Sequence, residues 1–268
     1  MTAVFIIIIL LVIYAAIENK FILLIRREQI KDDGVKIVHI GDLHHRRIGR
    51  NNSRLLRAVS EEKPDIIIIS GDLVSRDCTD FSNVSETLKG LMKIAQVYLV
   101  TGNHEADLSP EYFSELEKVI SDSGAVLLRN KTISVEIRGR SLNISGLELE
   151  QTVYKKNGSY RNLDVPADDE IYRKLGDKSD GENLLIVHNP FFAEYYARWG
   201  ADYAFCGHVH GGSVRIPFTD IGLLSPERRL FPKYTKGIYT VDKMSLFVTS
   251  GIGKARLFNP SEIVVYTI

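Results

Sequence analysis

Five short apolar runs in this 268-residue chain each end in a group of Asp, Asn or His residues. With those ends included, the runs read VKIVHIGDLH, DIIIISGDL, VYLVTGNHE, LLIVHN and DYAFCGHVH. Apolar runs of this length predict buried strands, and in an open α/β sheet the loops at the carboxyl ends of the strands gather along one edge. Residues as distant in sequence as Asp42 and His210 are therefore expected to meet. A glycine directly precedes four of the motifs, where it allows a tight turn and a close approach of the backbone.

The polar residues at these strand ends are of the types that bind divalent metal ions. The candidate ligands are Asp42, His44, Asp72, Asn103, His188, His208 and His210. Carboxylate, amide and imidazole donors in this mixture suit Mn²⁺, Fe²⁺ or Zn²⁺ in a hydrolytic centre, whereas a structural zinc site is richer in cysteine and closed. Taken singly, these residues have structural explanations as helix caps, turn residues or core histidines. Those explanations do not account for five motifs that coincide with strand ends.

Strands and helices alternate through the first half of the chain. Apolar runs predict strands at 36–40, 65–70 and 97–101, and helical spacing predicts helices at 53–62, 84–95 and 111–121. This order favours parallel strands with helical crossovers. Further strands are expected at 126–128, 134–138, 142–145, 183–187, 203–206, 237–241, 245–249 and 262–267, with a short helix near 169–174. The expected fold class is α/β, with two facing sheets flanked by helices in a four-layer α/β/β/α sandwich.

The motif series GDLH, GDLV, GNHE, a lone His in VHN and finally GHVH resembles the calcineurin-like metallophosphoesterase superfamily, over residues 35 to 210. The tail, HGGSVRIPF followed by GIGKARLFNPSEIVVYTI, more loosely resembles a bacterial membrane-associated branch of that superfamily, which includes UDP-diacylglucosamine-diphosphatase-like enzymes and exported phosphodiesterases. The resemblance implies a metal-dependent phosphoric ester hydrolase with two divalent ions as cofactors. The expected substrates are phosphodiester or pyrophosphate bonds of a small molecule or a lipid.

The resemblance also implies a role for each motif residue. The first ion would bind Asp42, His44, His210 and the shared Asp72, and the second would bind Asp72, Asn103, His188 and His208. A metal-bound water has its pKa lowered from 15.7 towards roughly 7, so that a hydroxide is available to attack phosphorus in line. His104 resembles the catalytic histidine that protonates the leaving oxygen or stabilises the transition state, an effect of about 10²–10⁴ in rate. Val74 stands where purple acid phosphatases carry a tyrosine, so an iron(III)–tyrosinate centre is not expected.

Several neighbouring residues have two interpretations. Arg46 and Arg47 could grip a phosphate, since guanidinium groups match phosphate oxygens, although solvated loop residues are the simpler explanation. The irregular segment 214–234 mixes apolar and basic side chains, which suits an amphiphilic phosphate near a bilayer or a loop that packs over its own side chains. His39 is expected in the core, and Glu105 is expected to cap or orient its loop.

The N-terminus differs in kind from the rest of the chain. Residues 1–17 carry no charge, and residues 4–17 are almost purely aliphatic, which predicts a membrane anchor near the short end of the usual length. A cleaved signal peptide lacks support because no basic n-region or small-x-small site is present, and a core helix or strand is rarely so uniform. The predicted domains are an anchor at 1–25, a linker at 26–34 and a catalytic domain at 35–268. Basic residues after the apolar run favour a cytoplasmic catalytic domain at the cell membrane, with the side left open.

Composition narrows the function further. The 34 basic and 34 acidic side chains cancel, so no global positive field attracts nucleic acid, and nucleic acid is not an expected partner. A nuclease or cyclic-nucleotide phosphodiesterase is the alternative within the same chemistry. A catalytically silent scaffold is the alternative outside it, and the complete ligand set opposes that interpretation. The two cysteines, Cys78 and Cys206, do not indicate a compartment.

Overall fold

The structure is a computed structural model that describes residues 2–217, 219, 221–226, 228–253 and 256–268. The strands are β1 (Leu23–Gln29), β2 (Lys36–Ile40), β3 (Ile66–Ser70), β4 (Gln96–Val100), β5 (Val126–Leu127), β6 (Lys131–Ile137), β7 (Arg140–Leu147), β8 (Glu182–Val187), β9 (Tyr203–Cys206), β10 (Gly237–Val241), β11 (Met244–Val248) and β12 (Ser261–Thr267). They form two six-stranded sheets, ordered β1-β12-β2-β3-β4-β5 and β10-β11-β9-β8-β7-β6.

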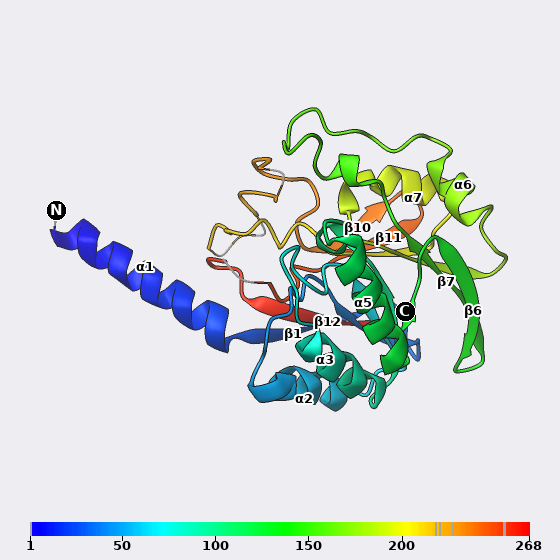
Figure 1. Ribbon diagram of the computed structural model, residues 1–268, viewed down its shortest axis with the longest axis horizontal. Helices are drawn as coiled ribbons and strands as arrows, with labels where there is room; N and C mark the ends of the chain where they lie inside the picture. Colours follow the sequence, from blue (N-terminus) through cyan, green and yellow to red (C-terminus); the bar gives the residue numbers. More distant parts are fainter. Residues whose placement is uncertain (1, 218, 220, 227, 254–255) are drawn as a thin grey trace.

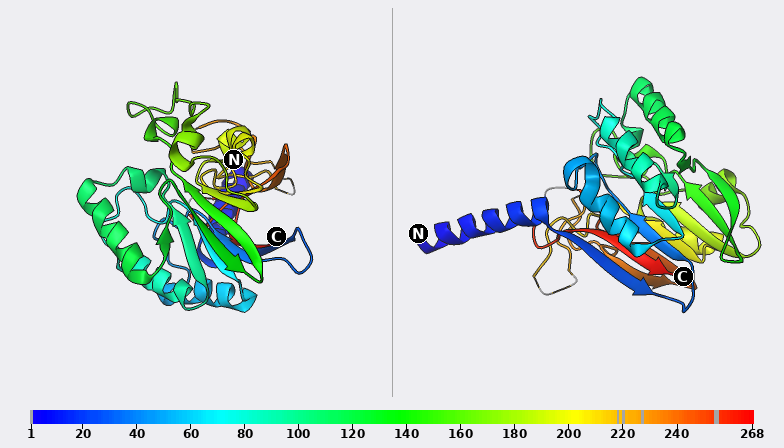
Figure 2. Two further views of the ribbon diagram at one scale, coloured as in Figure 1. Left: turned by 90° about the vertical axis from the view of Figure 1, so that its right-hand side faces the viewer. Right: turned by 90° about the horizontal axis from the view of Figure 1, so that it is seen from below.

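Helices cover the outer face of each sheet (Figures 1 and 2). The helices are α1 (Thr2–Phe21), α2 (Ser53–Glu62), α3 (Ser82–Met92), α4 (Asn103–Ala106), α5 (Pro110–Ser123), α6 (Glu170–Leu175) and α7 (Ala193–Trp199), with 3-10 turns η1 (Arg50–Asn52), η2 (Gln151–Val153) and η3 (Pro190–Phe192). Helices α2, α3 and α5 pack on the first sheet, and α6 and α7 pack on the second. The predicted four-layer α/β/β/α sandwich is confirmed.

The central strands are buried on both faces, which explains their unbroken apolar sequences. In β3, Ile67 and Ile69 point into the core beneath the helices, whereas Ile66 and Ile68 point into the core between the two sheets. All four isoleucines are at most 2% exposed. A third apolar cluster lies between the second sheet and helices α6 and α7. Cys206 lies in that cluster and is buried, as its apolar run predicts.

The five strands that precede the motifs run parallel to one another within each sheet, although β2 also pairs antiparallel with β12. Strand β3 pairs parallel with both β2 and β4, and β8 pairs parallel with both β7 and β9. The carboxyl ends of these strands therefore lie at one edge of each sheet, and the two sheets face each other. This arrangement brings the loops after β2, β3, β4, β8 and β9 together.

Helix α1 projects away from the sandwich (Figures 1 and 2). Its described side chains are largely exposed, with Val4, Leu10 and Val12 each 59–63% accessible, so it is not a core helix. Within the described residues, the segment Val4–Phe21 has the length and composition of a membrane-crossing helix, a test that signal sequences also pass.

The expected linker at 26–34 begins inside a strand. Strand β1 follows α1 almost directly and pairs parallel with β12 over seven residues, from Leu23 to Gln29. Leu23 and Ile25 of this edge strand pack against the core beneath the helices, whereas Arg26 pairs with Glu28 and Glu262 and Arg27 pairs with Glu62. Charged side chains on an edge strand resemble a polar linker in sequence, and they discourage edge-to-edge association.

Candidate metal centre

The strand ends place all seven predicted ligands along one edge of the sandwich. Asp42 and His44 follow β2, Asp72 follows β3, Asn103 opens α4 after β4, His188 follows β8, and His208 and His210 follow β9. The catalytic candidate His104 lies beside Asn103 in α4. The convergence expected from the carboxyl ends of parallel strands is present in the fold.

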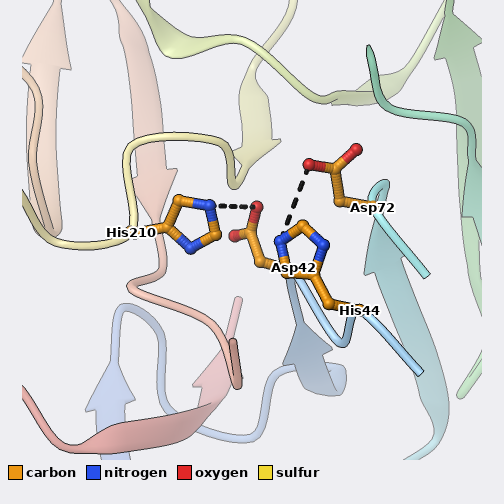
Figure 3. Close-up of side chains that lie close together, drawn as sticks. All are labelled: Asp42, His44, Asp72 and His210. Atoms are coloured by element: carbon orange, nitrogen blue, oxygen red, sulfur yellow. Dashed lines mark ion pairs between the residues drawn. The ribbon is translucent and has the colours of Figure 1, made fainter. Parts of the chain in front are cut away.

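Four of these side chains form a compact cluster (Figure 3). One potential ligand atom from each of Asp42, His44, Asp72 and His210 lies within 4.8 Å of the others. His188 reaches the same centre, because its Nε2 is 3.3 Å from Asp72 Oδ2 and 4.0 Å from Asp42 Oδ1. Two carboxylates and three imidazoles therefore share one small volume.

The two remaining candidates lie beside this cluster. The backbone amide of His208 donates to Asp42 Oδ1 at 3.0 Å, and its ring centroid lies 5.0 Å from that of His188. Asn103 is 8% exposed, and it lines a cavity of about 90 Å³ together with Asp72 and His208. The cavity gives the centre an opening large enough for a small polar group.

Three buried polar atoms at this site have no hydrogen-bond partner among the described residues: Asp42 Oδ2, Asn103 Oδ1 and His188 Nε2. Unpaired buried polar atoms are costly, and native proteins rarely leave them without a ligand. Nδ1 of His188 faces the Ser70 carbonyl oxygen at 2.7 Å, which leaves Nε2 aimed at the centre, the arrangement common to metal-bound histidines. The residues present therefore fit divalent cations.

The pKa shifts of the clustered side chains in the metal-free chain also indicate a site suited to positive charge. Burial and the nearby Asp72 raise the pKa of Asp42, with His188 opposing them. Burial also disfavours the charged form of Asp72, but His188, His104 and His44 outweigh it and hold its pKa well below the usual range. The two carboxylates in turn outweigh burial at His188 and raise its pKa. A proton on His188 thus supplies positive charge at a place where a divalent cation would supply more.

Backbone conformation at the site is unusual. Five non-glycine candidates have positive φ angles: Asp42 (48°), His44 (48°), Asp72 (51°), His208 (68°) and His210 (52°). Such conformations cost of the order of 1–3 kcal/mol each and cluster at functional sites. Two of the glycines that precede motifs allow close contact with the carboxylates, since a Cβ on Gly102 or Gly207 would come within 3 Å of Asp72 or Asp42, respectively.

Glu105 joins two of the motif loops. Its carboxylate accepts hydrogen bonds from the backbone amides of Gly102 (2.7 Å), Asp72 (3.0 Å) and Val74 (2.8 Å). The role in orienting the loop that its position in the GNHE motif predicts is confirmed. Glu105 fixes Asp72 from behind, and the carboxylate of Asp72 remains free to face the centre.

His104 lies at the rim of the centre. Its backbone amide donates to Asp72 Oδ1 at 2.9 Å, and its Nε2 lies 3.9 Å from Asp72 Oδ2. The backbone amide of Arg76 donates to His104 Nδ1 at 3.2 Å, and the guanidinium Nη2 of the same residue lies 3.1 Å from Nε2, so Arg76 presents N–H donors to both ring nitrogens. Burial lowers the pKa of His104 to about 4 although Asp72 opposes the shift, and the ring is therefore neutral near pH 7.

The two arginines after His44 have different roles. Arg46 is 6% exposed, and its Nη1 donates to the carbonyl oxygens of Ile252 and Gly253 and to Ser261 Oγ. Arg46 thus ties the loop after β2 to the C-terminal segment, and the expected solvated position is wrong for this residue. Arg47 is exposed, with its Nε directed at Asn83 Oδ1.

The 214–234 segment exposes much of its apolar surface. Leu230 and Phe231 are 71% and 61% exposed, and Ile221 is 46% exposed, so these side chains do not pack beneath the loop. Phe218, which contributes to the apolar character of this segment in sequence, lies outside the described residues.

Three residues at the site follow from no sequence motif. Arg76 contacts His104, the ring of Tyr154 lies 5.0 Å from that of His208, and Nη2 of Arg256 lies 3.3 Å from Nδ1 of His210. The proximity of Arg76 to the GDLV motif is the only feature of the sequence that could have indicated its place at the site. Arg256 comes from the segment before β12, and only folding brings it to the loop after β9.

A cavity of about 740 Å³ lies beside the metal centre and not at it. It is lined by the end of α1 and by the loops that follow β2 and β3: Asn19, Lys20, His45, Arg46, Arg47, Asp77, Cys78, Thr79, Asp80 and Asn83. His45 is next to the candidate ligand His44, so this groove adjoins the centre along the chain.

Comparison with known proteins shows which protein family, related sequences and solved structures this chain is similar to. The calcineurin-like phosphoesterase profile matches residues 35–212. The chain is 24% identical to the uncharacterized metallophosphoesterase YkoQ of Bacillus subtilis (strain 168), over 82% of this chain and 77% of that protein. It is also 24% identical to phosphodiesterase YaeI of Escherichia coli (strain K12), over 81% of this chain and 75% of that protein. The phosphopantetheinyl hydrolase PptH from Mycobacterium tuberculosis has the same fold, with a TM-score of 0.51, 16% identity and coverage of 80% and 88%.

Proposed function

Because the chain belongs to the calcineurin-like phosphoesterase family and is a metal-dependent phosphoester hydrolase, we propose that it hydrolyses phosphodiester or pyrophosphate bonds with two divalent ions. The observation that carries this proposal is that Asp42 Oδ2 and Asn103 Oδ1 are buried without a hydrogen-bond partner, while His188 Nε2 meets the carboxylates of Asp72 and Asp42 at the same centre. A silent scaffold would have no reason to retain them at a cost in stability.

The seven strand-end residues divide naturally between two ions. The first would be held by Asp42, His44, His210 and Asp72, and the second by Asp72, Asn103, His188 and His208. The family resemblance makes Asp72 the shared ligand, and its Oδ2 lies 3.8 Å from His44 Nε2 and 3.3 Å from His188 Nε2, one histidine of each set. When bound, the ions supply the positive charge that activates water and neutralises the phosphoryl oxygens.

His104 serves as a hydrogen-bond donor to the leaving oxygen. Nε2 of His104 lies 3.9 Å from Asp72 Oδ2 and 3.1 Å from Nη2 of Arg76, so the imidazole and the guanidinium group stand together at the centre. A donor fixed at this position stabilises charge as it develops on the oxygen of the breaking bond. Arg76 is held in place by an ion pair with Asp107 at 2.8 Å.

The substrate is a phosphodiester or pyrophosphate with part of its structure at the membrane surface. The name of the related YaeI supports the diester, and the 740 Å³ groove supports the location, because Asn19 and Lys20 at the end of α1 form one of its walls. Lys20 and Arg47 give the groove basic side chains suited to an anionic headgroup, beside the acidic Asp77 and Asp80. Membership in the UDP-diacylglucosamine-diphosphatase-like branch rests on the resemblance of the C-terminal sequence.

Helix α1 is the membrane anchor in this proposal, and the catalytic domain already begins with β1, because β1 pairs with β12 along its whole length. The candidate span Val4–Phe21 supports the anchor. Lys20 lies at the end of the span and Arg26 and Arg27 follow it, and this basic flank supports a catalytic domain on the cytoplasmic side.

Metal analysis combined with turnover tests the proposal. The full-length chain in detergent is depleted with a chelator, reloaded with Mn²⁺, Fe²⁺ or Zn²⁺, and assayed with bis-p-nitrophenyl phosphate. We expect about two ions per chain and hydrolysis that depends on them. Asp72→Asn should lose both ions and activity, whereas the matched control Asp168→Asn, a residue with a 79% exposed side chain, should retain both. Full activity of Asp72→Asn would exclude the shared-ligand role.

A screen of lipid, nucleotide and cyclic phosphates then separates the substrate classes. Faster turnover of a phospholipid diester in mixed micelles than of any nucleotide supports the membrane-surface substrate. Preference for cyclic nucleotides or DNA would instead support the nuclease or cyclic-nucleotide phosphodiesterase alternative.

A further inference from the structure

The last turn of helix α1 is docked on the loop formed by residues 256–259. Asn19 Nδ2 donates to the backbone carbonyl of Arg256 at 2.7 Å, and the backbone amide of Arg256 donates to Asn19 Oδ1 at 3.1 Å. One turn earlier, the ring of Tyr14 packs against Phe258 with a centroid distance of 5.2 Å. A single side chain of α1 therefore binds both the amide and the carbonyl of one residue, which fixes the backbone of the loop at that point.

The same loop contacts His210. Nη2 of Arg256 lies 3.3 Å from His210 Nδ1, and Asn259 Nδ2 donates to the His210 carbonyl oxygen at 2.5 Å. Arg256 is 3% exposed, and its Nη2 also donates to the Ser250 carbonyl oxygen. Its Nε and Nη1 have no partner among the described residues, so few other contacts hold this side chain in place. The position of the loop backbone therefore decides where the guanidinium group meets the His210 ring.

Helix α1 is fixed to the catalytic domain and is not joined to it by a flexible linker. Glu18, in the same turn as Asn19, is completely buried. Arg54 of helix α2 donates to the carbonyl oxygen of Phe21 at 2.8 Å, and β1 begins at Leu23, two residues after Phe21. A helix that served only as an anchor would not need a buried carboxylate and three hydrogen bonds to the domain that it tethers.

We propose that the last turn of α1, through Asn19, is a positioning element of the metal centre that holds the 256–259 loop in place, so that Arg256 and Asn259 fix His210. The proposal rests on the proposed function in one respect, namely that His210 is a metal ligand. It makes the apolar helix part of the support for the site, and it makes Asn19 and Arg256 positioning residues for the reaction. Residues that orient metal ligands in this way typically contribute 10–100-fold in metal affinity or activity.

The test compares Asn19→Ala with Ile17→Ala in the full-length chain in detergent. Ile17 lies on the same helix and is 48% exposed. Mn²⁺ affinity is measured by electron paramagnetic resonance after chelation, and the visible absorption of the Co²⁺-loaded protein reports the ligand geometry. We expect Asn19→Ala to bind Mn²⁺ about 10–100-fold more weakly and to alter the Co²⁺ spectrum. Ile17→Ala should match the wild type within about twofold, because it leaves the loop untouched.

The outcomes are distinguishable from failure of the proposed function. If the wild type binds Mn²⁺ but Asn19→Ala binds it equally well, the positioning role is wrong and the proposed function stands. If the wild type itself binds no metal, the proposed function fails. If Asn19→Ala has a lower melting temperature than the wild type in chelator, Arg256→Lys is used for the test instead. This variant keeps the contact with Asn19, because Arg256 makes that contact through its backbone. Wild-type Mn²⁺ affinity in Arg256→Lys would then overturn the proposal.

Discussion

A Cβ atom on Gly102 would lie 2.2 Å from Oδ1 of Asp72, so the loop after β4 leaves no room for a side chain beside this carboxylate. Gly102 also donates its backbone amide to Glu105, the residue that holds the Asp72 amide. The glycine of the GNHE motif is therefore required for the close approach of two motif loops, as its place before the motif residue predicts.

Gly102→Ala is expected to abolish metal binding and turnover of bis-p-nitrophenyl phosphate, because the backbone must move away from Asp72 to admit the methyl group. Gly139→Ala is the matched control, since a Cβ there meets no atom within 4 Å. The control has a positive φ and should lose only about 1–2 kcal/mol of stability. Retained metal and activity in Gly102→Ala would show that the loops are looser than the structure indicates.

His104→Ala is expected to keep both metal ions and to lower kcat by about 10²–10⁴-fold. The reason is that His104 faces Asp72 from the rim, close to the breaking bond, while the seven strand-end residues suffice to bind two ions. Metal content and kcat measured on the same sample decide the matter. Loss of an ion in this variant would identify His104 as a ligand.

The stability of the metal-free protein should fall in mild acid because His39 is buried as the neutral imidazole. Burial, with a smaller effect of Arg26, lowers its pKa to about 3. The unfolded chain therefore binds a proton near pH 6.5 that the folded chain refuses, so this contribution to stability is present above pH 6.5 and is lost as the pH falls towards 3. Between pH 7 and pH 5 the free energy of unfolding should drop by about 2 kcal/mol on account of this group.

Urea unfolding in chelator at the two pH values measures this loss, with His39→Gln as the comparison because glutamine does not titrate. His39 is fully buried, and its Nε2 lies 2.8 Å from Ser70 Oγ, a contact that glutamine can replace. The variant should lose less stability than the wild type over the same interval. Equal losses in both proteins would exclude His39 as the source.

The effect of N-terminal truncation on stability and activity should depend on how many residues are removed. Removing residues 1–12 takes away exposed apolar helix and should give an active protein with less need for detergent. Removing residues 1–25 also deletes Asn19 and the first residues of β1, including Leu23 and Ile25, which pack against the core. Losing these two half-buried side chains should cost about 1.5–3 kcal/mol. Melting temperature and turnover of the two truncated proteins compare directly, and equal values would show that the strand contributes little.

The core strands and the site could be predicted from sequence because both have a local signal. Strand β3 contains four consecutive isoleucines. An unbroken apolar run of this length predicts a strand that is buried on both faces of its sheet. Helix α7 gave no comparable signal, since it spans only seven residues directly after the 3-10 turn η3. Strand β1 was obscured by its charges, which an edge strand tolerates and a linker shares.

The sequence by itself determined the order of strands and helices and the chemical types at the strand ends, because residue type and periodicity are properties of neighbouring residues. Only the tertiary structure decided that Arg46 is buried against the C-terminal segment, that Asn19 binds the backbone of Arg256, and that Arg256 reaches His210. The residues in each of these contacts are separated by 46 to 237 positions in the sequence. Because the packing of two sheets and one helix creates these pairs, no local sequence pattern encodes them.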